Sequence, residues 1–181
     1  MITQRRQFLS YPLAAAAYSL SHRVAARNIQ YPDRYLSFFH AHTGEKITIV
    51  YWSNGEYLTD NLAKINWILR DYHTDDIKPI DPRLLNILHL LQRKLSLDPL
   101  THPFQILSAY RTKKTNEKLR KIVEGVSRNS FHLEGKALDF NIPGVSQRDV
   151  HKAAVQLAVG GVGHYPNAKF IHIDSGPLRT W

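Results

Sequence analysis

Cysteine is absent from this 181-residue sequence. Its absence excludes disulfide bonds and every metal site built on thiolate ligands, so a metal ion would have to be held by histidine and carboxylate side chains. It is compatible with an exported protein that folds without disulfides and equally with a cytosolic one. With 43% hydrophobic residues, the chain is long enough to form one compact domain with a substantial core.

Long hydrophobic runs are also missing, because the apolar stretch at residues 8–20 is shorter than the ~20 residues that span a bilayer. This stretch is rich in alanine and follows two arginines, as in the hydrophobic part of a signal peptide. The segment Arg5-Arg6-Gln7-Phe8-Leu9 resembles a bacterial twin-arginine export signal, with residues 24–26 as the cleavage region. A basic amphipathic tail or an uncleaved anchor is the alternative. We expect residues 1–27 to be the export signal and residues 28–181 to be the folded domain.

Acidic residues are missing from residues 1–27, which hold four of the 24 basic side chains. The remaining 20 basic and 15 acidic residues give a net charge of +5. Such a charge attracts polyanions, among them cell-wall polymers and nucleic acids. The basic run within residues 113–128 has no interleaved aromatic residues that would stack on bases, so we expect a solvated helix face there.

No internal repeat, low-complexity segment or interior linker interrupts residues 28–181, which predicts a single domain. Alternating apolar residues and two glycine-containing turns predict an antiparallel meander within residues 35–58. Helical spacing predicts helices over residues 62–72, 81–95, 115–122 and 146–157, and alternation predicts strands over residues 104–108, 139–142, 160–165 and 169–173. Strands and helices mix without a regular βαβ rhythm, which predicts an α+β fold with a central antiparallel sheet and flanking helices.

Side chains that could bind a metal are concentrated in residues 129–140, N-S-F-H-L-E-G-K-A-L-D-F. His132 and Asp139 lie seven positions apart, and Gly135 between them lets the chain bend so that both side chains converge. His172 follows in the segment F-I-H-I-D. Two imidazoles and one carboxylate are a typical ligand set for a hydrolytic zinc ion that keeps water in its fourth position. The alternative is that both histidines are ordinary polar residues and Asp139 is a capping or salt-bridging carboxylate.

Four other histidines are not expected to take part. His40 and His42 lie near a predicted hairpin turn, where surface exposure is the favoured interpretation and metal binding the alternative. His73 and His89 belong to the predicted helices, and we expect no catalytic role for them.

Several motifs occur in an order that is characteristic of a known family. Residues 130–139 match the pattern S-x-H-x-x-G-x-A-x-D, and residues 108–111, S-A-Y-R, resemble the S-x-Y-R element that precedes it. In these motifs the chain is similar to the D-alanyl-D-alanine carboxypeptidase and dipeptidase family, which is grouped with the lysostaphin-like and hedgehog-like zinc folds. Residues 160–163 (G-G-V-G), 170–176 (F-I-H-I-D-S-G) and 179–181 (R-T-W) resemble a branch of exported murein endopeptidases.

This resemblance implies that His132, Asp139 and His172 are the ligands of a Zn²⁺ cofactor. It also implies that Arg111 and Ser130 bind the substrate or stabilise the oxyanion of the reaction, because a guanidinium suits both a carboxylate and a tetrahedral oxyanion.

The chain departs from the wider family at the general base. Lys169 occupies the position, three residues before the last ligand, where many members have a glutamate. Asp174 should share a strand face with His172 and is the first candidate for the base or for a partner of that histidine. His164 is the second candidate, since an imidazole titrates near neutral pH.

Together these features predict an exported zinc metallopeptidase of the periplasm or cell envelope that hydrolyses peptide cross-links of peptidoglycan, including 3–3 links between diaminopimelate residues. Its partner would be peptidoglycan and not nucleic acid, and the mature chain would be a monomer without a transmembrane anchor. One alternative is a catalytically inactive module of the same fold that binds cell-wall peptides, which Lys169 favours. Another is a basic nucleic-acid-binding protein with steeply salt-dependent binding, which conflicts with an export signal.

Overall fold

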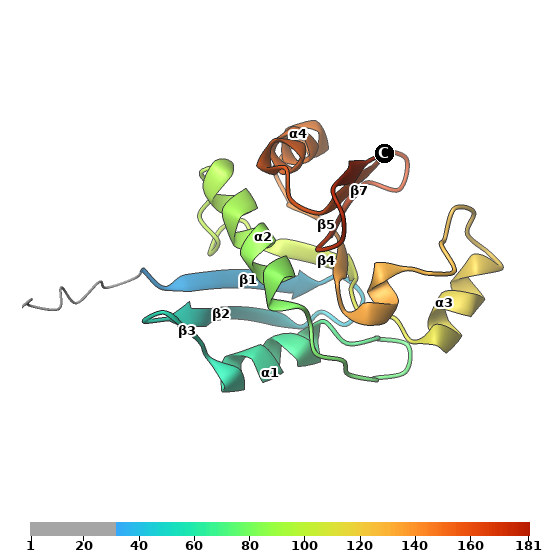
Figure 1. Cartoon of the computed structure of the whole chain (residues 1–181), viewed down its shortest axis with the longest axis horizontal. Coiled ribbons are helices and arrows are strands. Elements are labelled where there is room, and N and C mark those ends of the chain that lie inside the picture. The colour runs from blue at the N-terminus through green and yellow to red at the C-terminus, as the bar shows by residue number, and fades with distance from the viewer. Residues whose placement is uncertain (1–31) are drawn as a thin grey trace, which may run out of the picture.

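The computed structural model describes residues 32–181 (Figure 1), so the predicted export signal at residues 1–27 lies outside the described part of the chain. The strands are β1 (Arg34–His40), β2 (Lys46–Ser53), β3 (Glu56–Tyr57), β4 (Phe104–Ser108), β5 (Ala137–Asn141), β6 (Gly161–Tyr165), β7 (Phe170–Asp174) and β8 (Arg179–Thr180). The helices are α1 (Thr59–Ile68), α2 (Pro82–Lys94), α3 (Lys113–Arg120), the 3-10 helix η1 (Phe131–Glu134) and α4 (Gln147–Leu157). Within residues 32–181, no helix combines the length and the apolar character needed to cross a membrane.

All strands join one sheet in the order β3-β2-β1-β4-β5-β7-β6-β8. Five of the seven neighbouring pairs are antiparallel, whereas β1–β4 and β6–β8 are parallel. The α+β prediction is confirmed, and the sheet is mixed where a purely antiparallel one was expected. The pair β1–β4 is parallel because α1 and α2 separate β3 from β4, so that a crossover replaces a hairpin between the two halves of the sheet.

The core lies on the face of the sheet that α2 and α4 cover. Helix α2 packs against β1 and α4, and α4 packs against β6 and β7. Asp81 starts α2 by accepting a hydrogen bond from the backbone N–H of Arg83 at 2.9 Å, with Pro82 as the first helical residue. Four leucines of the predicted apolar stripe are fully buried, namely Leu84, Leu85, Leu88 and Leu91, and Leu95 at its end is half-buried.

The alternation of side chains along β5 and β7 separates the core from the polar face of the sheet. Leu138 and Phe140 of β5 and the isoleucines of β7 belong to the buried core. The residues between them, Asp139 and His172, therefore leave the sheet on the opposite face. Because of this alternation, one face of the sheet packs against the core and the opposite face carries the candidate ligands.

His40 is buried, with 1% of its surface exposed, whereas the sequence predicted a surface residue. Its Nδ1 atom accepts hydrogen bonds from the backbone N–H groups of His42 and Thr43, each at 3.3 Å. The pKa of His40 is lowered to about 4, mainly by burial and also by the charges of His42 and Arg70, with Glu45 acting in the opposite direction. His40 is thus a neutral structural histidine that holds the turn after β1. His42 is exposed, as predicted.

Candidate metal centre

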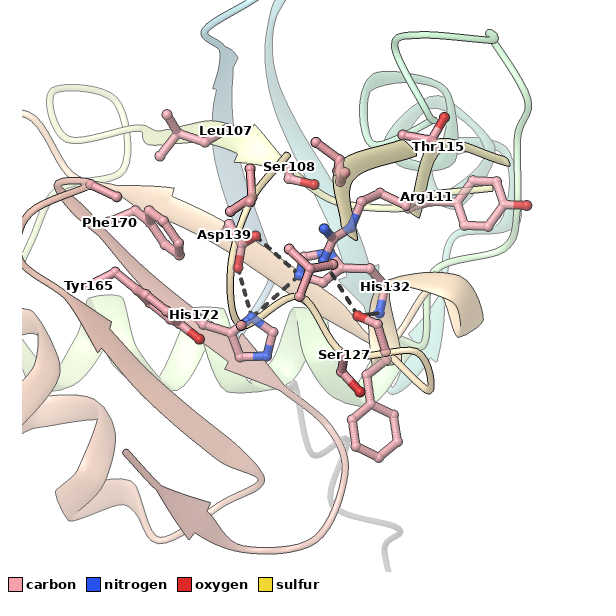
Figure 2. Close-up of a pocket in the computed structure, with 18 of the residues that line it drawn as sticks. Leu107, Ser108, Arg111, Thr115, Ser127, His132, Asp139, Tyr165, Phe170 and His172 are labelled. Atoms are coloured by element: carbon pink, nitrogen blue, oxygen red, sulfur yellow. Dashed lines mark hydrogen bonds and ion pairs between the residues drawn. The ribbon is translucent and has the colours of Figure 1, made fainter. Parts of the chain in front are cut away.

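The three candidate ligands come from elements that meet on the polar face of the sheet. Asp139 of β5 and His172 of β7 are direct cross-strand partners, so their side chains lie next to each other. His132 lies in η1, the short helix that leads into β5. Figure 2 shows the three side chains pointing toward one another at the floor of a pocket.

Two local features fix the position of His132. Ser130 precedes η1, and its Oγ atom accepts a hydrogen bond from the backbone N–H of His132 at 3.4 Å. Gly135 ends η1 with a φ of 67°, in the left-handed region. A Cβ atom at this position would lie 2.6 Å from the carbonyl oxygen of Pro79. The bend predicted between His132 and Asp139 therefore requires glycine.

The ligand atoms of the three side chains all lie within 4.8 Å of one another. His132 Nε2 is 3.3 Å from His172 Nδ1 and 3.2 Å from Asp139 Oδ2. His172 Nδ1 is 2.7 Å from Asp139 Oδ1. Such a cluster of two nitrogens and one carboxylate fits the ligand set of a catalytic zinc ion, which takes three protein ligands.

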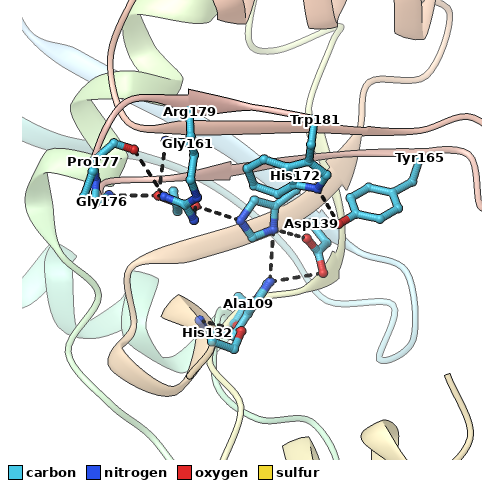
Figure 3. A network of polar contacts seen from close by, with 12 residues as sticks. Ala109, His132, Asp139, Gly161, Tyr165, His172, Gly176, Pro177, Arg179 and Trp181 are labelled. Carbon is cyan, nitrogen blue, oxygen red and sulfur yellow. Dashed lines mark hydrogen bonds and ion pairs between the residues drawn. The ribbon is translucent and has the colours of Figure 1, made fainter. Parts of the chain in front are cut away.

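The outer hydrogen bonds of the two imidazoles support this fit. His132 Nδ1 lies 2.6 Å from the carbonyl oxygen of Ala109, which can only accept, so Nδ1 carries the proton and Nε2 presents its lone pair to the cluster. His172 Nε2 lies 3.0 Å from Asp174 Oδ2, which in the same way leaves Nδ1 of His172 to the cluster. Figure 3 shows Ala109 beside His132. The outer contacts therefore orient each ring so that His132 Nε2 and His172 Nδ1 face the cluster, as metal ligands would.

The charges of the cluster act strongly on one another. Burial would raise the pKa of Asp139, but the imidazoles of His132 and His172 hold it well below its usual range. Burial lowers the pKa of His132. For His172, burial is outweighed by hydrogen bonds to Asp139 and Asp174, which raise its pKa to about 9.

Asp174 lies behind His172 and not at the open side of the cluster. It is 0% exposed, and besides His172 its carboxylate accepts hydrogen bonds from Arg179 and from the backbone N–H groups of Gly161 and Gly176. The guanidinium of Arg179 lies between the rings of Phe131 and Trp181, 4.9 and 5.1 Å from their centroids. With all of its oxygens engaged, Asp174 is placed to orient His172.

His164 and Lys169 are not part of the cluster. Gly163 pairs with His172 across β6 and β7, so the next residue, His164, faces the other side of the sheet. There it stacks on His151 of α4, with 5.1 Å between ring centroids. Lys169 is exposed in the turn between β6 and β7. The structure thus separates His164 from the proposed ligands, and we do not retain it as a candidate base.

Arg111 and Ser130 line the pocket above the cluster, a cavity of about 970 Å³. Arg111 Nη2 donates to Ser130 Oγ at 3.4 Å, and its backbone N–H donates to the carbonyl oxygen of His132. The Nε atom of Arg111 is buried without a hydrogen-bond partner among the described residues. Burial lowers the pKa of Arg111, opposed by the charge of Asp139 and by other acidic groups nearby. A guanidinium in this state is available to an anionic group of a ligand.

The sequence alone did not assign a role to several residues that build this site: Ala109, Tyr165, Phe170, Arg179 and Trp181. For Arg179 and Trp181, one signal was present in the sequence. Gly161 and Gly163 alternate along a predicted strand, and glycine within a strand marks a close approach of another group. In the structure these glycines lie beside Arg179 and Trp181.

Comparisons with known proteins agree with the geometry of the site. A family model described as peptidoglycan L,D-endopeptidase MepK matches residues 29–181. Peptidoglycan L,D-endopeptidase MepK of Escherichia coli (strain K12) is 41% identical over 148 residues, which cover 82% of this chain and 80% of that protein. Probable peptidoglycan L,D-endopeptidase MepK of Haemophilus influenzae is 33% identical over 178 residues, covering 98% of this chain and 95% of that protein. No solved structure gives a significant match. The resemblance found in the motifs is confirmed, and the chain belongs to the peptidoglycan L,D-endopeptidase MepK family.

Proposed function

We propose that this chain is a zinc-dependent endopeptidase that hydrolyses peptide cross-links of peptidoglycan. The observation that carries the proposal is the convergence of His132, Asp139 and His172, with one nitrogen of each imidazole facing the carboxylate, at the floor of an open pocket. The membership of the chain in a family of peptidoglycan endopeptidases gives the class of substrate.

In this proposal His132 Nε2, Asp139 and His172 Nδ1 hold Zn²⁺. When bound, zinc supplies the polarisation of the scissile carbonyl group and the lowering of the pKa of a water molecule to ~7. Asp174 is assigned to positioning, because it keeps the proton of His172 on Nε2. It is not assigned the role of general base.

Arg111 and Ser130 are proposed to bind the substrate. The stem peptides of peptidoglycan carry carboxylates, and the guanidinium of Arg111 faces the pocket without an ion-pair partner among residues 32–181. Ser130 holds that guanidinium through its Oγ atom and extends the polar wall toward the substrate. The same guanidinium could stabilise the charge that develops on the carbonyl oxygen.

The bond proposed for cleavage joins an L-centre to a D-centre. The two relatives described above are named L,D-endopeptidases. In murein, the 3–3 link between two meso-diaminopimelate residues is a bond of this kind, and we propose it as the preferred substrate, with the 3–4 link as the comparison.

We further propose that residues 1–27 direct the chain through the twin-arginine route to the periplasm or cell envelope, where its substrate lies. The pair Arg5-Arg6 before a short apolar stretch supports this location. After removal of the signal, the net charge of +5 would favour retention on the anionic cell wall.

The test is cleavage of defined cross-linked muropeptides by the purified, zinc-loaded chain. Mass spectrometry would follow the conversion of 3–3 and 3–4 dimers to monomers, with a chelated sample beside it. His172→Ala should abolish zinc binding and cleavage, while His102→Ala, which removes an imidazole from a surface loop, should leave both unchanged. Full activity of His172→Ala would contradict the ligand assignment.

A second candidate is a module that binds cell-wall peptides without cutting them. Lys169 at the position of the family glutamate favours it, as does the complete engagement of Asp174 in hydrogen bonds. This function predicts that the zinc-loaded chain retains muropeptides and releases no fragments. The same experiment therefore separates the two functions.

A further inference from the structure

Tyr165 lines the pocket on the same face of the sheet as the proposed ligands. It is the last residue of β6 and pairs with Phe170 of β7, two positions before His172 on that strand. Its ring stacks on the ring of Phe170, with 4.4 Å between centroids and 17° between planes, which fixes the direction of the side chain. In Figure 2, Tyr165 and Arg111 approach the cluster from different sides.

The hydroxyl group of Tyr165 accepts a hydrogen bond from the indole Nε1–H of Trp181 at 2.7 Å. An indole N–H can only donate, so the Tyr165 oxygen must be the acceptor in this bond. The phenolic proton is then free to be donated elsewhere. No acceptor for it is found within residues 32–181, and Tyr165 lines the pocket. Figure 3 shows the Tyr165 hydroxyl group beside the indole of Trp181.

Trp181 is held firmly enough to orient this hydroxyl group. Its backbone N–H donates to Val162 and its carbonyl oxygen accepts from His164, so it continues the edge of the sheet beside β6. Its indole ring lies over Gly163, where a Cβ atom would be 2.5 Å from Cε2 of the ring. The ring also lies beside His172, with 5.3 Å between ring centroids. Gly163 thus provides the space in which Trp181 reaches Tyr165.

We propose that Tyr165 is a catalytic residue whose O–H group donates a hydrogen bond to the substrate carbonyl oxygen as that oxygen becomes negatively charged. Trp181 is proposed as its positioning residue. The inference rests on the endopeptidase function proposed above and adds to it a donor that the motifs of the family resemblance did not contain.

The chemistry requires no proton transfer from Tyr165. When the oxygen of water forms a bond to the carbonyl carbon, the electron pair of the C=O π bond moves to the carbonyl oxygen. Tyr165 stabilises that charge through its hydrogen bond and keeps its proton. When that electron pair forms the C=O π bond again, the C–N bond breaks and its electrons leave with the nitrogen. The amine that leaves carries a proton that came from the water. Preorganised donors at a developing oxyanion raise kcat, because their hydrogen bonds to the oxygen are stronger in the transition state than in the ground state.

The experiment compares kcat and KM for a cross-linked muropeptide dimer in four variants of the zinc-loaded chain. Tyr165→Phe should lower kcat by about 10²-fold, the loss typical of one oxyanion donor, and change KM little. Trp181→Phe keeps an aromatic ring, removes the N–H and should lower kcat by a smaller factor. In the double variant Tyr165→Phe/Trp181→Phe, kcat should equal that of Tyr165→Phe alone, because Trp181 acts through the hydroxyl group.

Trp67→Phe is the matched control. Trp67 is 48% exposed and Trp181 is 47% exposed, and each donates one indole hydrogen bond, but the acceptor of Trp67 is Glu45, away from the pocket. We expect kcat of Trp67→Phe to equal that of the wild-type chain.

A readout that is independent of turnover is the binding of a phosphinate isostere of the scissile bond, which imitates the tetrahedral oxyanion. Calorimetry should show that Tyr165→Phe weakens this binding at least tenfold, leaves binding of the cleaved product unchanged and retains the wild-type zinc content.

Unchanged kcat in Tyr165→Phe, with cleavage by the wild-type chain, would refute this proposal alone. An additional loss in the double variant would refute the positioning role of Trp181. Absence of cleavage by the wild-type chain would refute the proposed function and this inference with it.

Discussion

Substitution of Asp174 by asparagine separates two roles that a carboxylate beside a zinc ligand can have. Asp174→Asn keeps the size of the side chain and removes its charge. The carboxylate accepts from five donors: His172 Nε2, two guanidinium nitrogens of Arg179 and two backbone N–H groups. An asparagine has one acceptor oxygen, and in either orientation its NH₂ group would face donors. The substitution therefore weakens the hold on His172.

The size of the effect follows from these contacts. Loss of an outer partner of a metal-bound histidine typically lowers metal affinity 10–100-fold, which corresponds to about 1.4–2.7 kcal/mol. The free energy of unfolding should fall as well, because Arg179 would lose its ion-pair partner. Removal of one partner from a buried pair costs about 3–5 kcal/mol, and since the Arg179 side chain is 38% exposed we expect about 1–3 kcal/mol here.

Zinc affinity would be measured by competition with a chromogenic chelator, and kcat would be measured at saturating zinc. We expect weaker zinc binding in Asp174→Asn and recovery of much of the kcat when zinc is in excess. Asp33→Asn, a change at an exposed carboxylate before β1, serves as the control and should behave as the wild-type chain. If Asp174→Asn bound zinc with wild-type affinity but stayed inactive at saturating zinc, Asp174 would be the general base and the positioning role would be wrong.

Three further predictions concern pH, packing and the metal. Because the pKa of His40 is about 4 in the fold and 6.5 ordinarily, the unfolded chain takes up a proton first as pH falls. About 3 kcal/mol of stability should then be lost between pH 6.5 and 4. His40→Asn, which keeps an acceptor and does not titrate, should flatten this part of the curve in denaturant titrations; an unchanged slope would contradict the argument. Gly163→Ala should displace the Trp181 indole and alter its Nε1–H resonance in NMR spectra, whereas an unchanged resonance would show that the ring is not confined there. Zinc at 100 times its Kd should add about 2.7 kcal/mol to the free energy of unfolding, and chelation should remove it, a difference that calorimetry would detect and that His172→Ala should lack.

Much of the fold could be predicted because its signals are local. The leucine stripe of α2 and the Asp81-Pro82 start have a helical period and a capping pattern that leave few alternatives. Helix α3 was predicted over residues 115–122 and begins earlier, at Lys113, because Thr112 Oγ1 accepts from the backbone N–H of Thr115 and caps it. Strand β8 has two residues and was not predicted, since so short a segment has no periodicity.

The sequence by itself predicted His132, Asp139 and His172 as candidate ligands, from their residue types and from the family motifs that contain them. His132, Gly135 and Asp139 are close in the chain, and the alternation of a strand makes His172 and Asp174 share a face. The short spacing and the shared strand face follow from the local chain, and neither depends on where the two segments lie in the fold.

Only the tertiary structure decided which groups stand next to that centre. The alternation along a strand shows which side chains share a face, but it does not show which face packs against the core. It therefore could not predict that His164 lies against α4 while Tyr165 lies at the pocket. Three other features also depend on how separate segments pack together. They are the burial of His40, the contacts of Arg179 with the rings of Phe131 and Trp181, and the hydrogen bond from Trp181 to Tyr165. Such contacts depend on how the strands are ordered in the sheet, and that order is a property of the whole chain.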